Sequence, residues 1–316
     1  MHMVNVDSYR GCLLGLALGD ASCAPYEGGL IERLLWRFIG KTKAGENRYT
    51  DDTQMSLDVA KSFFENTGVD QDHLARTFAS SYKWSRGYGP GTAGILKNIK
   101  NGVKWQDVNR LRYPQGSYGN GAAMRAPVVA LYYYGNEADI VVAVQKVSEI
   151  THAHPLAIEG ARLVAVSTSS ALDRLDTSEF LQRVINSCES KDYMTRMSQA
   201  AQWIEGQESI DSKTVSMKLG NGMAAIDSCV TAIYVALRFL NSEFSAMIGF
   251  INKCSGDTDT IGAMAGAIWG AFNGLMGLSH LDVDRLEAAS EIKGIATKLF
   301  ELAPNKTLQP NGAVEL

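Results

Sequence analysis

Glycine recurs at every fourth position in two separate segments of this 316-residue chain. The first segment, RGCLLGLALGD, places glycine at positions 11, 15 and 19, and the second, IGAMAGAIWGAFNGL, places it at positions 262, 266, 270 and 274. Residues four apart lie on the same face of an α-helix, so each segment would present a face without side chains. Another backbone can approach such a face closely. The pattern predicts two buried helices that pack tightly and bring their acidic ends to the same place.

The second glycine segment also raises the question of a membrane span. Residues 261–278 contain no charged side chain, and their spacing resembles the GxxxG pattern of packed transmembrane helices. The segment is, however, rich in Gly and Ala, marginally short for a span, and directly follows an acidic cluster. The N-terminal sequence MHMVNVDSYR has no apolar stretch of the kind found in secretory signals. We therefore expect a buried helix of a soluble protein, with no membrane partner.

The charge balance and the cysteines restrict the class of protein further. The chain has 30 Lys and Arg against 34 Asp and Glu, so no basic excess is available to neutralise the phosphates of a nucleic acid. Its apolar fraction of 46% is that of a globular protein. The five cysteines are scattered, odd in number and without a CxxC pair, which argues against a disulfide framework or a zinc site. These features predict a cytoplasmic protein, and no leftover apolar surface helix suggests more than a monomer.

Most of the remaining chain has apolar residues at helical spacing. Long helical runs cover residues 155–172, 226–240 and 282–302, and the best strand candidate, residues 128–134, fits a buried helix equally well. Glycine-rich loops are expected at residues 27–29, 87–92 and 116–121, and the segment between Glu27 and Thr50 is also read as a loop. No linker divides the chain. We predict one all-α domain over residues 1–316, folded as a compact, orthogonally packed multi-helix bundle.

Two acidic clusters, YTDDT and GDTDT, each directly precede a predicted helix. Asp and Thr at such positions commonly cap the helix. Paired carboxylates exceed what capping requires, however, and the pattern of Thr beside paired Asp occurs twice. Carboxylates and hydroxyls are the ligands that Mg²⁺ prefers. An EF-hand beginning at Asp257 is excluded, because its twelfth position is Ile268, where a bidentate Glu is needed.

Three further motifs carry polar groups that could bind a ligand. Glu27 lies in APYEGG, shortly after the first glycine segment. The sequence GSYGNGAAMR has three glycines in six residues, so its backbone N–H groups could face an anion, although it lacks the ending of a P-loop. His152 lies in THAHP, where a buried or ligand-contacting histidine is expected rather than a zinc ligand, since partner ligands are missing.

Taken together, these segments resemble the ADP-ribosylglycohydrolase family. The matching pieces occur in the family's order and run from Arg10 to about residue 274: RGCLLGLALGD, APYEGG, YTDDTQM, GYGPGT, GSYGNGAAMR, THAHP, LGNGMAA and SGDTDTIGAMAGAIWGA. The pair TDDT and GDTDT, about 200 residues apart on a helical background, is the most specific part of the resemblance.

The resemblance implies a helical bundle with two Mg²⁺ ions in a central cleft. The positions that match the family's metal ligands are Thr50, Asp51, Asp52, Asp257, Asp259 and Thr260. Glu27 matches the acidic residue at the metals and the scissile bond. The positions that match substrate contacts are Tyr88, Gly89, Gly116, Ser117, Tyr118, Gly119, Asn120 and His152. Five carboxylates against two divalent cations would leave the centre nearly neutral, and the glycine loop would hold the diphosphate apart from them.

The implied activity is hydrolysis of the glycosidic bond between ADP-ribose and a modified protein. The loop GSYGNGAAMR looks closer to the branch of the family that acts on O-linked forms, such as ADP-ribosyl-serine, poly(ADP-ribose) or O-acetyl-ADP-ribose. An N-glycohydrolase of ADP-ribosyl-arginine is the alternative within the family. Two other classes stay open: a crystallin-like module that binds ADP-ribose without catalysis, and a Mg²⁺-dependent phosphohydrolase that cuts the diphosphate.

Overall fold

The structure, a computed structural model, describes residues 4–303, and every regular element in that range is helical. Three isolated bridges are the only β-type pairing there. The predicted all-α class is confirmed. The α-helices are α1 (Val6–Cys23), α2 (Leu30–Ile39), α3 (Asp51–Asn66), α4 (Gln71–Ser81), α5 (Pro90–Lys100), α6 (Trp105–Val108), α7 (Ala126–Tyr132), α8 (Glu137–Glu149), α9 (Pro155–Leu172), α10 (Thr177–Asn186), α11 (Lys191–Glu205), α12 (Ser212–Leu219), α13 (Cys229–Arg238), α14 (Phe244–Cys254), α15 (Thr258–Asn273) and α16 (Ala289–Leu302).

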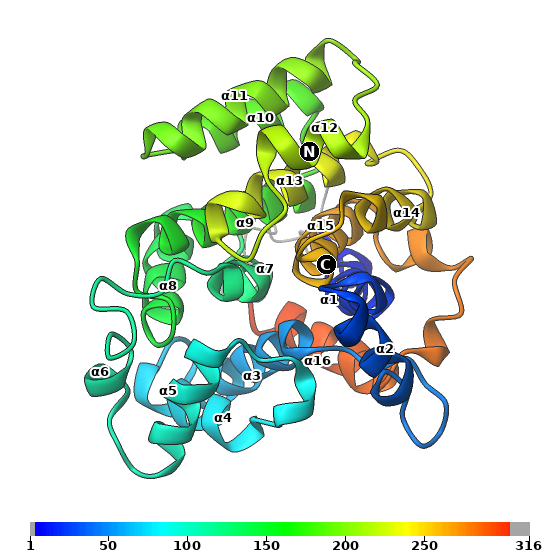
Figure 1. The fold of residues 1–316 in the computed structure, drawn as a ribbon. Helices are drawn as coiled ribbons and strands as arrows, with labels where there is room; N and C mark the ends of the chain where they lie inside the picture. The colour runs from blue at the N-terminus through cyan, green and yellow to red at the C-terminus, as the bar shows by residue number, and fades with distance from the viewer. Residues whose placement is uncertain (1–3, 304–316) are drawn as a thin grey trace, which may run out of the picture.

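Short 3₁₀ helices connect several of these elements. They are η1 (Ala24–Tyr26), η2 (Trp84–Arg86), η3 (Asn120–Arg125), η4 (Ala225–Asp227), η5 (Leu275–Leu278) and η6 (Val283–Arg285). Figure 1 shows the helices crossing at many different angles, with α15 next to α1 near the middle of the molecule. Helix α15 also contacts α9, α13 and α14, so it forms the centre of the bundle.

The two glycine segments form the contact between α1 and α15. A methyl group placed on Gly15 would lie 2.2 Å from the carbonyl oxygen of Gly266, and one on Gly19 would lie 2.0 Å from that of Gly262. Gly11 faces Gly270 in the same way. The helices are therefore antiparallel, and no side chain separates their backbones along this line. The predicted close packing is confirmed, and it brings the C-terminal end of α1 to the N-terminal end of α15.

The ends of several helices differ from the sequence prediction. Gly274 adopts φ +70° and caps α15, and it still belongs to the glycine contact, since a methyl group on Gly11 would lie 2.4 Å from its carbonyl carbon. Residues 30–39 were expected in a loop but form α2. Helix α5 begins at Pro90, inside the expected loop 87–92, because proline is well suited to the first turn of a helix. Residues 128–134 are mostly helical, as part of α7.

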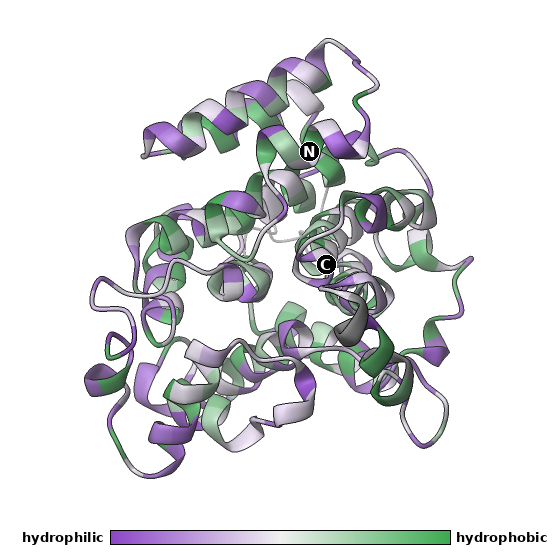
Figure 2. Cartoon of the chain, viewed as in Figure 1, coloured by the Kyte–Doolittle hydropathy of each residue, from purple (hydrophilic) through white to green (hydrophobic). Residues whose placement is uncertain are grey.

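The core is one cluster of buried apolar side chains that draws on helices from α1 to α16. Figure 2 shows hydrophobic residues concentrated on the inner helices, whereas α11 alternates between hydrophilic and hydrophobic along its length. Such alternation is typical of helices that bury one face only. Within residues 4–303, none of the helices combines the length and the apolar character that crossing a membrane requires.

Candidate active site

A cavity of about 470 Å³ collects residues from every motif of the family resemblance except RGCLLGLALGD. Its walls come from the loop after η1, the start of α3, the loop before α5, the segment 117–121, the residues before α9, the segment 223–227 and the start of α15. Of the predicted site residues, those that line it are Glu27, Asp51, Asp52, Gly89, Ser117, Tyr118, Gly119, Asn120, His152, Asp257, Asp259 and Thr260.

The first acidic cluster forms the beginning of α3. Thr50 is the N-cap residue, and its hydroxyl accepts a hydrogen bond from the backbone N–H of Asp52 and donates to Asp52 Oδ2 at 2.9 Å. The cluster is anchored by Asp20, near the end of α1. The Asp20 carboxylate accepts bonds from the backbone N–H of Thr50 and Thr53, at 3.0 and 3.1 Å, and from the Thr53 hydroxyl. Helix α1 thus fixes the position of the α3 N-terminus.

The second cluster forms the beginning of α15. Asp257 is the N-cap residue, but its side chain makes no capping hydrogen bond. Instead Asp257 Oδ2 accepts a bond from Asn120 Nδ2 at 2.5 Å, and the same amide lies 2.9 Å from Ser228 Oγ. The hydroxyl of Thr260 lies 3.4 Å from Asp52 Oδ2 and so links the two clusters. Capping therefore explains Thr50 but not Asp257.

Carboxylates from distant segments converge in the cavity. Glu27, Asp257 and Asp259 each place an oxygen within 4.8 Å of the other two. Burial raises the pKa of Asp259 well above its ordinary range, and the neighbouring Glu27 and Asp52 raise it further. Burial likewise raises the pKa of Asp51 and Asp52. Carboxylates crowded in this way favour protonation unless a cation compensates their charge.

One oxygen in this group is left without a partner. Asp52 Oδ1 is buried and receives no hydrogen bond within the described residues, although Asp52 Oδ2 receives two. A buried carboxylate oxygen without a donor is costly. The oxygen-only donor set and this unpaired atom fit a hard divalent cation. The residues present are therefore compatible with a metal centre.

The glycine loop lines the same cavity as the carboxylates and is held on both sides. The backbone N–H of Asn120 donates to the carbonyl of Met223 at 2.9 Å, and that of Ala225 donates to the carbonyl of Tyr118 at 2.9 Å. On the other side Gly116, at φ +89°, lies so close to residues 153 and 154 that a methyl group would come within 2.4 Å of their backbone. Because the N–H groups of Gly116 and Asn120 already donate within the protein, fewer of the loop's donors are left for a ligand than the sequence suggested.

His152 lies at the wall between the loop and the interior. Burial, and to a lesser degree Arg125, lower its pKa to about 3, so the ring is neutral at physiological pH. Its Nδ1 lies 2.8 Å from the hydroxyl of Thr151. Gly119 and Gly121 make room for the ring, since a methyl group on Gly121 would lie 2.6 Å from His152 Cε1.

Three of the predicted residues lie behind the cavity wall. Thr50 turns its hydroxyl to Asp52, the buried Tyr88 packs against Tyr82 with ring centroids 4.9 Å apart, and Gly116 supports the loop from behind. Conversely, sequence reasoning missed two acidic residues, Asp20 and Asp227. Asp20 was visible as the end of the first glycine segment. Nothing local marked Asp227, which lines the cavity and pairs with Arg196 at 2.8 Å.

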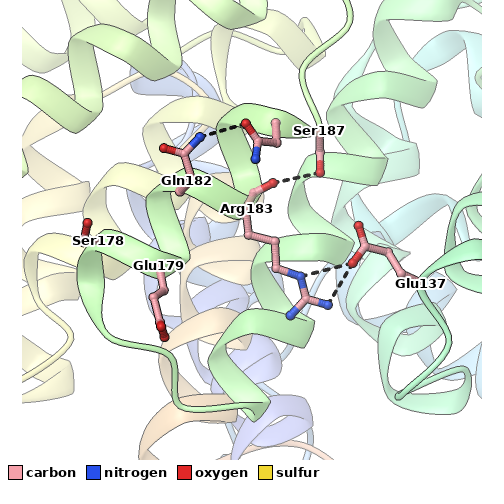
Figure 3. Close-up of a pocket in the computed structure, with 7 residues that line it drawn as sticks. Glu137, Ser178, Glu179, Gln182, Arg183 and Ser187 are labelled. Carbon is pink, nitrogen blue, oxygen red and sulfur yellow. Dashed lines mark hydrogen bonds and ion pairs between the residues drawn. The ribbon is translucent and has the colours of Figure 1, made fainter.

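A second hollow, on the surface between α8 and α10, has a different character (Figure 3). Arg183 extends from α10 toward Glu137, and its guanidinium pairs with Glu137 at 3.0 Å and with Asp173 at 2.6 Å. Its charge is therefore already compensated. The hollow contains none of the predicted site residues and is lined by Glu137, Ser178, Glu179, Gln182, Arg183, Asn186 and Ser187.

The family model of the ADP-ribosylglycohydrolases matches residues 1–308, so the chain belongs to this family. Among curated relatives, the ADP-ribosylhydrolase ARH3 of Mus musculus is 31% identical over 86% of this chain and 85% of its own. The corresponding protein of Gallus gallus is 30% identical over 93% of both chains. The ADP-ribosylarginine hydrolase Tri1 of Pseudomonas putida is 24% identical over 95% of this chain and 79% of its own.

A solved structure supports the same fold. It is described as an ADP-ribosylglycohydrolase-related protein complex and superimposes with a TM-score of 0.68 at 22% identity, covering 94% of this chain and 98% of its own. The predicted family is confirmed. The chain is a hydrolase that acts on ADP-ribosyl linkages, so a module that only binds ADP-ribose no longer describes it.

Proposed function

We propose that the chain hydrolyses an O-linked ADP-ribosyl bond on a protein, or in poly(ADP-ribose) or O-acetyl-ADP-ribose, with two Mg²⁺ ions in the cavity. The observation that carries this proposal is the convergence of Glu27 with Asp257 and Asp259 in the cavity that the glycine loop also lines. A carboxylate centre next to a glycine-rich loop suits a ligand with a sugar at one end and a diphosphate in the middle.

The metal ligands in this proposal are Thr50, Asp51, Asp52, Asp257, Asp259 and Thr260. Support comes from the unpaired Asp52 Oδ1 and from the raised carboxyl pKa values, which a cation would bring down again. When bound, Mg²⁺ would polarise and orient the hydroxyls of the distal ribose. The side-chain amide of Asn120 donates to Asp257 and holds it in place. Asn120 therefore orients this metal ligand in addition to contacting the substrate.

Glu27 is the proposed catalytic residue. It is half-buried, follows η1 directly and lies next to Asp257 and Asp259, so it stands at the edge of the carboxylate group, where a substrate enters. Cleavage at the anomeric carbon passes through an oxocarbenium-like state, in which a carboxylate can exchange a proton with water or with the leaving oxygen. The metals would hold the sugar while Glu27 moves the proton.

The substrate contacts in this proposal come from Gly89, Ser117, Tyr118, Gly119 and His152, with Tyr88 and Gly116 supporting them from behind. The exposed ring of Tyr118 offers adenine a face for stacking. We also propose that residues 1–316 act as one domain and as a monomer in the cytoplasm. One continuous core supports the single domain.

The choice of linkage rests on similarity. The chain is about 30% identical to relatives named ARH3 and 24% identical to one named for ADP-ribosylarginine. The loop GSYGNGAAMR favours the O-linked branch as well. ADP-ribosyl-arginine is the second candidate substrate, supported by the match to Tri1 over most of this chain.

Product identification by mass spectrometry tests the proposal. Peptides carrying ADP-ribosyl-serine or ADP-ribosyl-arginine are incubated with the protein in Mg²⁺ or in EDTA. We expect free ADP-ribose from the serine peptide, in Mg²⁺ only. Release of AMP would indicate cleavage of the diphosphate instead, release from the arginine peptide alone would reverse the choice of linkage, and full activity in EDTA would refute the metal centre.

A variant tests the role of Glu27. We expect Glu27→Gln to lower ADP-ribose release by at least about 100-fold, because it removes the proton-transferring group. The matched control is Glu205→Gln, since Glu205 is exposed at the end of α11, and it should keep wild-type activity. Near-normal turnover by Glu27→Gln would show that another residue moves the proton.

A further inference from the structure

Arg125 is a buried cation that no carboxylate contacts within the described residues. Its side chain is fully buried at the end of η3, and its Nη atoms donate to the carbonyls of Gly121 and Val147 and to the hydroxyl of Thr151, the last at 2.9 Å. These three acceptors belong to the glycine loop, to α8 and to the segment that precedes α9. Burying a guanidinium in this way costs free energy. We therefore expect Arg125 to have a role in the site that it supports.

The hydroxyl of Thr151 connects this cation to His152. Thr151 is itself buried, and its Oγ1 lies 2.9 Å from Arg125 Nη2 and 2.8 Å from His152 Nδ1. A hydroxyl has one proton to donate. Because an arginine can only donate, its bond to Oγ1 leaves the hydroxyl proton free to point at His152 Nδ1.

The other neutral tautomer of His152, with the ring proton on Nδ1, is less favourable. If Nδ1 carried the ring proton, two donors would point at Oγ1, and the hydroxyl proton would need another acceptor. The described residues supply no further partner for that hydroxyl. An unsatisfied buried donor costs more than a single hydrogen bond contributes. The network therefore favours Nδ1 as acceptor, which leaves the proton of the neutral ring on Nε2.

The Nε2 side of the ring lies against the cavity wall. A methyl group on Gly119 would lie 3.3 Å from His152 Nε2, and one on Gly121 would lie 2.9 Å from it. His152, Gly119 and Gly121 all line the cavity. A proton on Nε2 is thus placed beside the loop that is proposed to hold the anionic part of the ligand.

We propose that Arg125 and Thr151 are positioning residues that hold His152 as the neutral Nε2–H tautomer, so that His152 donates a hydrogen bond to a phosphate oxygen in the cavity. The tautomer is a property of the free protein, whereas the identity of its acceptor rests on the proposed function. The low pKa of His152 agrees with a neutral ring. A neutral donor with a fixed proton recognises an anion without adding a second buried cation next to Arg125.

Nitrogen NMR of the free protein tests the tautomer directly. The chain has five histidines, so the ring nitrogens of ¹⁵N-histidine-labelled protein are few enough to assign, with His152→Gln identifying the signals of interest. At about pH 7 we expect His152 to show an unprotonated Nδ1 and a protonated Nε2. A protonated Nδ1, or a doubly protonated ring, would overturn the proposal without any ligand being present.

Two variants of Thr151 test the role of its hydroxyl. Thr151→Val removes the hydroxyl with little change in shape, and we expect mixed tautomers and a Kd for ADP-ribose raised about 10-fold. Thr151→Ser keeps the hydroxyl and should restore both the nitrogen signals and the affinity. A purely structural role would leave the tautomer of Thr151→Val unchanged, and that result would refute the proposal.

The two proposals fail in different ways. If the wild-type tautomer is as expected but ADP-ribose does not bind, the proposed function is wrong while the network survives. If ADP-ribose binds tightly and His152 carries its proton on Nδ1, the network is wrong and the function survives. Should Thr151→Val fail to fold, the wild-type spectrum and the Thr151→Ser variant still decide the tautomer.

Discussion

The α1–α15 contact and the cavity wall meet at the second acidic cluster, at the start of α15, but they are held together in different ways. Along the contact, backbones touch because side chains are missing: a methyl group on Gly266 would lie 2.1 Å from the carbonyl oxygen of Gly15. Across the cavity, polar side chains from several segments hold each other, as Asn120 holds Asp257. The first region fixes where the helices lie, and the second uses that position to concentrate charge. We therefore expect the first to govern stability and the second to govern activity.

A substitution in the glycine contact should have the largest effect. Gly266→Ala forces two helices apart at the centre of the molecule, and we expect it to lower the free energy of unfolding by about 3 kcal/mol or more. Chemical denaturation measures this loss. The control is Gly249→Ala in the exposed part of α14, where a methyl group meets nothing within 4 Å, and it should stabilise the protein by about 0.5–1 kcal/mol. Equal behaviour of the two variants would contradict the role of the contact.

A change in the carboxylate group should separate activity from stability. We expect Asp259→Asn to reduce ADP-ribose release by about 100-fold. In EDTA the same variant should unfold at a higher temperature than the wild type, because it removes one charge from a crowded, buried group. Calorimetry in EDTA and a turnover assay in Mg²⁺ measure the two effects. Exposed Asp192→Asn serves as the control for activity, and a loss of stability in EDTA would argue against charge crowding.

A buried carboxylate outside the cavity sharpens the comparison through pH. Burial raises the pKa of Asp58 from 3.8 to about 6, so the folded protein keeps this proton to higher pH than the unfolded chain does. The contribution of Asp58 to the free energy of unfolding should therefore fall by at most about 3 kcal/mol as pH rises from about 4 to about 6, and change little above that.

The variant Asp58→Asn isolates that contribution. It should flatten this part of the pH profile and stabilise the protein at about pH 8 by about 1–2 kcal/mol, less than the maximum because Asn alters the bonds to Gln54 and Ser81. Denaturation at several pH values measures the difference between the variant and the wild type. An unchanged slope would assign the dependence to the cavity carboxylates.

The smallest effect is expected where the two regions join. The hydroxyl of Thr258, the first residue of α15, donates to the carbonyl of Cys23 at the end of α1 at 3.1 Å. Thr258→Val removes this buried bond with little change in shape and should cost about 1 kcal/mol of stability. Activity should change little. A large loss of turnover without a matching loss of stability would mean that this bond aligns the cluster rather than merely supporting it.

The two regions were also unequally visible in the sequence. The glycine spacing is local, so it predicted the helix contact, including Gly274, whose backbone lies against Gly11. It did not predict that α15 ends there, at a positive φ. The clusters at residues 50–52 and 257–260 were found because each has its own pattern. The position of Asp227 could not be foreseen, since it depends on the pairing of residues 118–120 with residues 223–225 far along the chain. Likewise, no spacing rule could show that Asn120 contacts Asp257.

The pairing of α1 with α15 also imposes an order on biosynthesis. Gly11 contacts Gly270, about 260 positions later, so α1 leaves the ribosome long before the partner that covers its bare face. Contacts between such distant parts of a chain form late, because the cost of closing the intervening loop must be met first. Nascent chains that stop before α15 thus lack both the central helix contact and the second acidic cluster. The chain therefore cannot acquire activity until α15 has been synthesised.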